Sequence, residues 1–310
     1  MNRTRFIALA LLAVTSIANA QGSKESIAPK ETVEDPNKQQ VVPDLKAVPK
    51  PDKGYGTIIG QFIFDGKVPD KELLFKKGST SAKDPATCAA ADQYKNDLVI
   101  NEKNQGIRNI FVYEKAKTYA KKKDAIHPKL RKPKQPFLWF DQKGCRFYPK
   151  TLLVQVPTEG DKKMAEVRVV SNDPVNHNTR SAPLKNQPAN VTIGQMDREG
   201  IPFEFKAAET VPVEIKCDLH PHMKAHWLVM DHPYMAVSNV DGRFMIANLP
   251  EGKHELRLWH GTGFYLHKKI KEAKTPEYVV KKGKMYVEVK SGEVLNLKQI
   301  KLKAEWFIDK

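Results

Sequence analysis

Residues 211–223 read Val-Pro-Val-Glu-Ile-Lys-Cys-Asp-Leu-His-Pro-His-Met, a strand pattern that runs directly into a group of metal-binding side chains. The apolar residues at every second position alternate with Pro212, Glu214 and Lys216, and this period of two is typical of a β-strand with one buried face. The alternation predicts a strand that ends at Cys217, with the thiol pointing into the core, followed by a tight loop.

The loop brings together side chains that suit a redox-active metal. Cys217, His220 and Met223 offer a thiolate, an imidazole and a thioether at Cys-x2-His-x2-Met spacing. His177 lies 40 residues before Cys217 and follows the apolar alternation of residues 167–169, so it can come from the end of another strand. Two His and one Cys with a weak axial Met is an arrangement that suits copper. The sequence therefore predicts one copper ion at these four residues.

Short strand patterns recur along most of the chain, and long amphipathic helices are absent. This composition favours an all-β protein, for which a sandwich of two sheets is the usual architecture. Strands are expected at residues 56–64, 98–100, 107–112, 152–156, 167–169, 211–217, 225–229, 244–246, 254–259, 286–289 and 295–302.

The N-terminus carries the features of an export signal. Arg3 and Arg5 precede an apolar stretch at residues 6–17, and Ala18-Asn19-Ala20 supplies the small side chains that signal peptidase recognises. We expect a signal peptide at 1–20, with cleavage after Ala20, and a periplasmic or extracellular protein. Residues 21–53 are rich in Lys, Glu, Pro and Gln without an apolar period, which predicts a disordered leader. No later stretch is long and apolar enough for a transmembrane segment.

The chain has three cysteines, an odd number for an exported protein. One thiol must therefore be protected, paired between chains or bound to metal, and the neighbours of Cys217 favour metal. Cys88 and Cys145 are then the candidates for a disulfide, although the sequence does not fix the distance between them.

The protein is basic, with 52 Lys and Arg against 36 Asp and Glu. The excess is mostly Lys spread along the chain, with small clusters at 121–123 and 281–282, and no strip of Arg and aromatic residues suited to stacking bases is present. Export and this pattern argue against nucleic acid. A solvated cationic surface is the simplest interpretation, and steering toward an acidic redox protein such as a cytochrome, or toward an anionic envelope polymer, is the functional one.

The loop at 217–223 resembles that of the small blue copper proteins, the cupredoxins, and its spacing, with Pro after the first His, is most similar to the amicyanin type. The resemblance implies that His177, Cys217 and His220 are equatorial ligands and that Met223 is the axial ligand. It also implies that Asn178, outside the ligand set, ties the two ligand loops together. The implied fold is a Greek-key cupredoxin sandwich.

A second resemblance concerns residues 233–258, where Asp241-Gly242 and Pro250-Glu251-Gly252 turns separate three short strands. This pattern resembles the carboxypeptidase regulatory-like domain, a small transthyretin-like sandwich, whose opening strands have counterparts at 56–64 and 109–113. We therefore expect a cupredoxin domain at 135–230, inserted into a regulatory-like sandwich of 54–134 with 231–303. Three consecutive small units are the alternative.

The chain as a whole resembles exported bacterial cupredoxin-like proteins of the methylamine-utilisation type. The matching pieces are residues 141–147, the copper loop, residues 231–234 and Trp259-His260. Where those proteins commonly carry Pro-His, this chain has Pro149-Lys150.

No catalytic motif was found, and a metal closed off by four protein ligands has no open position for substrate, so we expect a protein that is not an enzyme. Electron transfer through an exposed edge of His220 is the favoured function. A non-redox envelope-binding module with a vestigial copper site and copper storage or delivery are the alternatives. Structural roles are expected for His232 and His260. His222 is either an exposed edge of the site or without a role in it, and His226 is expected on the face of its strand opposite Trp227.

Overall fold

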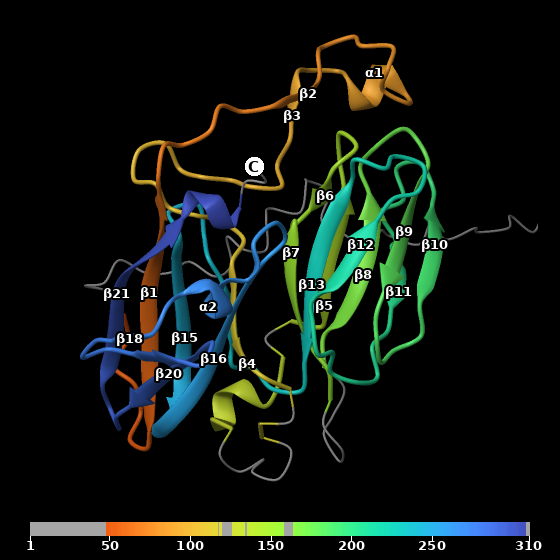
Figure 1. Ribbon diagram of the computed structural model, residues 1–310. Helices are drawn as coiled ribbons and strands as arrows, with labels where there is room; N and C mark the ends of the chain where they lie inside the picture. Colours follow the sequence, from red (N-terminus) through yellow and green to blue (C-terminus); the bar gives the residue numbers. More distant parts are fainter. Residues whose placement is uncertain (1–47, 117, 120–125, 134, 158–163, 308–310) are drawn as a thin grey trace, which may run out of the picture.

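The computed structural model describes residues 48–116, 118–119, 126–133, 135–157 and 164–307, and over these it is an all-β protein, as predicted (Figure 1). Its helices are short: α1 (Pro85–Cys88), α2 (Leu266–Lys269), η4 (Pro128–Leu130) and η5 (Ala304–Trp306). In this part of the chain no helix has the length and apolar character needed to cross a membrane. The expected signal peptide, most of the leader and the lysines at 121–123 lie outside the described residues.

The strands between residues 137 and 230 form two facing sheets, which we call the ligand sandwich. One sheet has the order β10-β9-β12-β13-β7 and the other has the order β11-β8-β5-β6. The strands are β5 (Phe137–Gln142), β6 (Phe147–Tyr148), β7 (Thr151–Gln155), β8 (Glu166–Ser171), β9 (His177–Ala182), β10 (Ala189–Ile193), β11 (Ile201–Phe203), β12 (Val213–Lys216) and β13 (Lys224–Met230).

The core of the ligand sandwich is built around Trp227, whose side chain is fully buried. Its ring meets Phe140 from the facing sheet edge-on, with centroids 4.8 Å apart, and Phe203 at 5.4 Å. Val213 and Ile215 are buried in the same core while Glu214 and Lys216 are not, so the predicted alternation before Cys217 is confirmed.

Replacing Trp227 by alanine should lower the free energy of unfolding by about 3–5 kcal/mol, because it removes a large side chain from a close-packed core. Urea denaturation of the variant and the wild type measures this difference. A loss below about 1 kcal/mol would contradict the assignment of Trp227 to the centre of this core.

Most of the remaining strands form a second unit, which we call the outer sandwich. A three-stranded sheet has the order β15-β1-β21, and the facing sheet has the order β14-β4-β16-β20-β19-β18, with β17 paired to β16. The strands are β1 (Tyr55–Asp65), β4 (Phe111–Glu114), β14 (Met235–Val237), β15 (Arg243–Pro250), β16 (Gly252–His260), β17 (Phe264–Tyr265), β18 (Ala273–Lys274), β19 (Val279–Lys281), β20 (Lys284–Val289) and β21 (Val294–Lys303).

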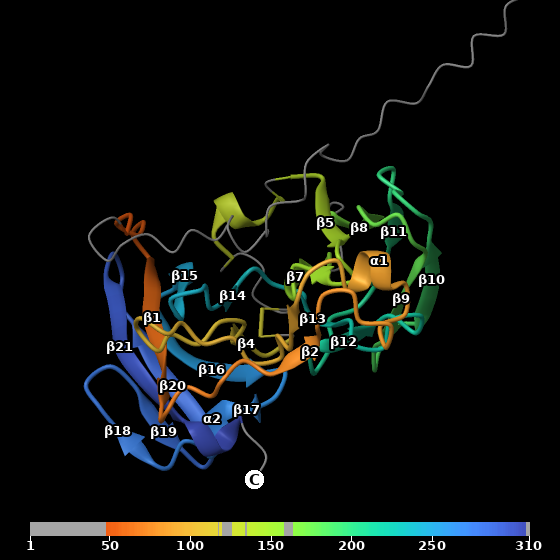
Figure 2. The ribbon, with the colours of Figure 1, turned by 90° about the horizontal axis from the view of Figure 1, so that it is seen from above.

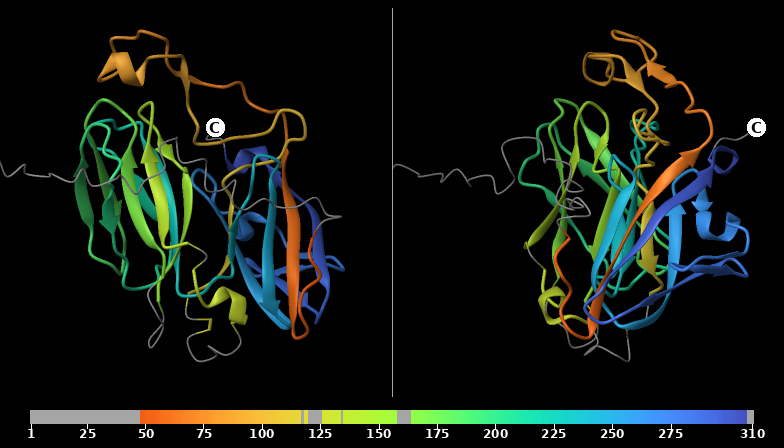
Figure 3. Two further views of the ribbon diagram at one scale, coloured as in Figure 1. Left: turned by 180° about the vertical axis from the view of Figure 1, so that it is seen from behind. Right: turned by 90° about the vertical axis from the view of Figure 1, so that its left-hand side faces the viewer.

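Strand pairing in the outer sandwich joins segments from both ends of the chain. β1 is antiparallel to β15 and parallel to β21, while β4 pairs with β14 and β16. The chain thus enters the outer sandwich, passes through the ligand sandwich and returns, and the two lie side by side in Figures 1 and 3. The domain boundaries at 134 and 231, and the regulatory-like identity of the outer sandwich, stay predictions.

Two local predictions in the outer sandwich have different outcomes. The Asp241-Gly242 turn is present, and Gly242 is required there because its φ is +74° and a Cβ would lie 2.3 Å from the carbonyl oxygen of Phe62. The strands expected at 98–100 and 107–112 are mostly wrong. Only a bridge between Ile100 and Ile107 forms, and β4 begins at residue 111, after Asn109 interrupts the extended backbone with a φ of 68°.

A long connection between β1 and β4 crosses over the top of the ligand sandwich. We call residues 66–97 of it the cap, which holds α1 and the hairpin of β2 (Leu73–Phe75) with β3 (Gln93–Tyr94). Figures 1 and 2 show the cap, in orange, with α1 above the ends of the ligand-sandwich strands. A disulfide between Cys88 and Cys145 ties α1 to the turn between β5 and β6, so the two candidate cysteines do pair.

Candidate metal centre

The candidate ligands meet at the end of the ligand sandwich that lies beneath the cap. β9 and β12 are neighbours, with Lys216 opposite Arg180, so the end of β12 lies beside the beginning of β9. This pairing brings Cys217, directly after β12, close to His177, the first residue of β9. His220 lies on the loop before β13, and all three side chains are at most 1% exposed.

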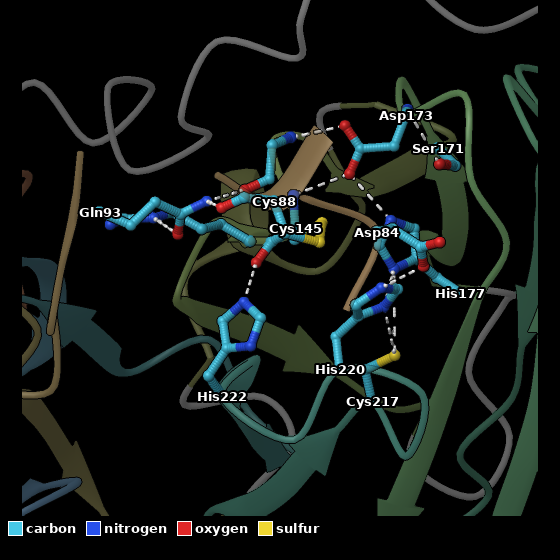
Figure 4. Close-up of a disulfide and its surroundings, with 12 residues drawn as sticks. Asp84, Cys88, Gln93, Cys145, Ser171, Asp173, His177, Cys217, His220 and His222 are labelled. Carbon is cyan, nitrogen blue, oxygen red and sulfur yellow. Dashed lines mark hydrogen bonds and ion pairs between the residues drawn. A yellow bond between two sulfur atoms is a disulfide. The ribbon is translucent and has the colours of Figure 1, made fainter. Parts of the chain in front are cut away.

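Three donor atoms converge at this point, as Figure 4 shows. The Nδ1 atoms of His177 and His220 are 3.0 Å apart, and the Sγ of Cys217 is 3.9 Å from the first and 3.7 Å from the second. A point in their plane lies about 2.1 Å from all three, close to the ~2.0–2.3 Å of metal bonds to imidazole and thiolate. The triangle therefore has the size that a first-row transition metal in trigonal coordination requires.

The outer ring nitrogen of each histidine faces a carboxylate. His177 Nε2 lies 2.8 Å from Asp173 Oδ2, and His220 Nε2 lies 2.9 Å from Asp84 Oδ2. Ionised carboxylates only accept hydrogen bonds, so the Nε2 atoms donate and the Nδ1 lone pairs are left facing the thiol. Two lone pairs and a sulfur that point at one another need a cation between them, either a proton or a metal ion.

The charges of the site are already biased toward metal binding. Burial raises the pKa of Cys217, but its interactions with the side chains of His177 and His220 outweigh burial and lower the pKa to about 6. Burial lowers the pKa of His177, but the hydrogen bonds to Asp173 and Cys217 outweigh it and raise the pKa to about 9. Near neutral pH the metal-free site therefore holds a thiolate and an imidazolium, and the thiolate is the form that binds metal.

Asn178 and Met223 complete the loop. The side-chain oxygen of Asn178 accepts hydrogen bonds from the backbone of Asp218, at 2.7 Å, and of Leu219, at 3.2 Å. Its backbone N–H lies 3.5 Å from the sulfur of Cys217. Asn178 thus ties β9 to the loop after β12. Met223 is 2% exposed and lies in the same core, and its backbone N–H donates to His220 at 2.9 Å.

The expected exposed edge of His220 is absent, and this prediction was wrong. His220 is only 1% exposed because the cap covers it and the carboxylate of Asp84 occupies the position next to Nε2. Sequence inspection missed Asp84, 136 residues from His220, and Asp173, four residues before His177. No local pattern marks Asp84, whereas Asp173 lies between the strand expected at 167–169 and His177.

The other histidines make hydrogen bonds to the backbone or pack against rings. His222 donates to the carbonyl of Cys145 at 3.1 Å, and His232 donates to that of Lys115 at 3.2 Å. The ring of His226 packs against Trp259, and His260 lies beside Thr262. Among the described residues, every group of three or more His, Cys, Asp or Glu donor atoms close enough for one metal lies at the candidate centre or its adjoining disulfide.

Two of these histidines should make the protein sensitive to acid. Burial, with the charge of Lys150, lowers the pKa of His226 to about 4, and burial, with a smaller effect of His226, lowers that of His260 to about 3. Both are neutral in the folded protein, while the unfolded chain takes up protons below its ordinary His pKa of about 6.5. Stability should therefore fall as the pH drops from about 6.5 toward 4, by about 1.4 kcal/mol per pH unit for each histidine.

Urea denaturation at pH 7.5, 5.5 and 4.5 measures this dependence, and His226→Gln should show a shallower one. An identical slope in the variant would contradict the assignment to His226.

Comparison with solved structures finds copper proteins that overlap about a third of the chain. A reduced Cu(I) form of an amicyanin mutant is 18% identical over 31% of this chain and 83% of its own, with a TM-score of 0.24. The purple cupredoxin from Nitrosopumilus maritimus is 19% identical over 29% of this chain and 97% of its own, with a TM-score of 0.22. A copper-containing nitrite reductase from Thermus scotoductus SA-01 is 20% identical over 30% of this chain, with a TM-score of 0.25, and the match spans only 22% of the reductase.

No protein-family model matches the chain, and no curated protein sequence matches it. The three structural likenesses named above have TM-scores of 0.25 or less and identities of 20% or less.

Proposed function

We propose that the protein binds one copper ion through His177, Cys217 and His220, with Met223 as a weak axial ligand, and transfers single electrons. The observation that carries the proposal is the buried triangle of two imidazole nitrogens and one thiolate. Two nitrogens and one sulfur near a plane suit copper in both its oxidation states, whereas zinc favours a tetrahedral set. Bound copper would supply a one-electron couple.

The residues around the triangle have separate tasks in this proposal. Asp173 orients His177 through its Nε2 proton, and Asn178 holds the ligand loop against β9. The cap keeps water from the ligands, all of which are buried. Because the four protein ligands leave no position for a substrate, we propose a carrier of electrons and not an enzyme.

We further propose that the protein acts in the periplasm or outside the cell, where its lysine-rich surface would attract an acidic redox protein such as a cytochrome. With His220 covered, the group between the ligand and solvent is Asp84, whose side chain is 39% exposed. An electron would therefore leave through the cap rather than through a bare histidine edge.

Potentiometric titration of the copper-loaded protein tests the proposal. A single reversible one-electron transition is expected, followed by rapid reduction of an added cytochrome. Copper that binds but neither cycles nor exchanges electrons would overturn electron transfer. Copper storage is the second candidate, favoured by the complete burial of the ligands, and it predicts fast transfer of Cu(I) to an acceptor protein.

Copper affinity should rise with pH. Between pH 6 and 9, His177 is protonated in the metal-free protein and Cys217 is not, so binding displaces one proton from the pair. The Cu(I) affinity is expected to increase about tenfold per pH unit over this range and to level off above pH 9. Competition with a chromophoric Cu(I) chelator at pH 6.5, 7.5 and 8.5 measures it, and a flat profile would contradict the protonation states assigned here.

A further inference from the structure

The side chain of Asp84 makes no hydrogen bond that would stabilise α1, the helix that follows it. Asp84 occupies the N-cap position of α1, where an aspartate side chain normally accepts a hydrogen bond from the first turn. No such bond is present, and its backbone is left-handed, with a φ of 55°. The carboxylate turns away from the helix and accepts instead from His220 Nε2 at 2.9 Å (Figure 4).

The disulfide holds this part of the cap over the site. Cys88 lies one helical turn after Asp84, and its partner Cys145 belongs to the turn beside the candidate centre. Gln93 adds a second link, because its side-chain amide donates to the carbonyls of Cys88, at 2.5 Å, and Gly144, at 2.7 Å. Asp84 is therefore fixed to the ligand sandwich by the disulfide and by the hydrogen bond from Gln93 of the cap to the carbonyl of Gly144.

The other half of the disulfide fixes the second carboxylate. Asp173 accepts hydrogen bonds from the backbone N–H groups of Gly144, at 2.5 Å, and Cys145, at 2.8 Å, while it also accepts from His177 Nε2. The disulfide thus joins two carboxylate–histidine pairs, one on each side of the donor triangle.

We propose that Asp84 is a positioning residue of the copper centre, which orients His220 and, together with Asp173, makes the centre favour Cu(II) over Cu(I). This inference rests on the copper site proposed above. A carboxylate on the outer nitrogen makes an imidazole a stronger donor, and nearby negative charge stabilises the ion of higher charge. Two such pairs in a buried site lower the reduction potential, and the cap carries one of them.

The test compares Asp84→Asn with Asp92→Asn. Asparagine keeps the shape of Asp84, tolerates the left-handed backbone and removes the charge. Asp92 is a matched control, because it lies on the same cap and accepts a hydrogen bond from the backbone of Lys77 without contacting a histidine. Each variant is loaded with copper, and its Cu(II) and Cu(I) affinities and its potential are measured.

For Asp84→Asn we expect the Cu(II) affinity to fall about 10- to 100-fold, the usual effect of losing a partner outside the ligand set. We expect a smaller loss of Cu(I) affinity. Each factor of ten by which the loss of Cu(II) affinity exceeds the loss of Cu(I) affinity raises the reduction potential by 59 mV. Asp92→Asn should leave both unchanged. Equal effects of the two variants, or none, would overturn the inference while the copper site stands.

A second readout needs no copper. In the metal-free protein, nitrogen NMR of the imidazole rings should show His220 with its proton on Nε2, bonded to a carboxylate and slow to exchange with water. In Asp84→Asn that proton should lose its low-field shift and exchange faster. A wild-type His220 with a free Nε2 overturns the role of Asp84, whereas a wild type that shows the bonded proton but binds no copper overturns only the proposed function.

Discussion

Replacing Cys217 by serine is expected to weaken copper binding by more than 100-fold. The thiolate is the only anionic donor among the proposed ligands, and its pKa of about 6 means that it is ready to bind at neutral pH. A serine hydroxyl fits the same space but stays protonated and is a poor ligand for Cu(I). Losing a hydrogen-bond partner outside the ligand set already lowers metal affinity 10- to 100-fold, so losing the thiolate ligand itself should lower copper affinity further.

The measurement is competition for Cu(I) against a chromophoric chelator. Met230→Leu is a suitable control, because Met230 is another buried sulfur-containing residue, in the apolar cluster between the sandwiches that holds Phe111 and Trp259. The control should bind copper as the wild type does. Unchanged affinity in Cys217→Ser would show that copper, if bound, lies elsewhere.

Removing the disulfide should cost about 4 kcal/mol of stability. Cys88 and Cys145 are separated by 57 residues, and closing a loop of that length in the unfolded chain accounts for about this amount in the chain-entropy model. Both cysteines are fully buried, so the Cys88→Ser/Cys145→Ser variant also places two hydroxyl groups in an apolar core. We expect a correspondingly lower midpoint of urea denaturation.

Urea denaturation of the wild-type protein with and without a dithiol reductant separates the loss of the covalent link from the burial of two hydroxyl groups. Reduction breaks the disulfide without changing the residues. A loss below about 1 kcal/mol in both experiments would contradict the tethering role assigned to the disulfide.

The parts of the fold and site that follow from local sequence were predictable. The alternation before Cys217 predicted a strand and a buried thiol, and β12 and the 1% exposure of Cys217 confirm both. β9 was not expected, because His-Asn-Thr-Arg-Ser-Ala has no apolar alternation. Four of its six residues are nevertheless buried, and only Arg180 and Ala182 are exposed. The buried side chains of β9 are polar and make hydrogen bonds, as His177 does with Asp173 and Asn178 with the backbone of Asp218, and hydropathy patterns do not register such contacts.

The parts that depend on distant contacts were not predictable. Asp84 contacts His220 although 136 residues separate them in the sequence. The cap that carries Asp84 is joined to the ligand sandwich by a disulfide whose pairing the sequence left open. A polar and lysine-rich segment such as the cap has no feature that indicates which surface it will cover. For this reason the sequence placed His220 at an exposed edge, whereas the folded chain buries it.

A visible absorption titration of the purified protein with Cu(II) tests the central claim most directly. The account predicts an intense thiolate-to-copper charge-transfer band that saturates at one copper per chain and is bleached by reduction, because Cys217 and two histidine nitrogens surround a single position. Absence of the band, together with no copper by metal analysis, would contradict the copper centre and leave a β-sandwich binding module as the better description.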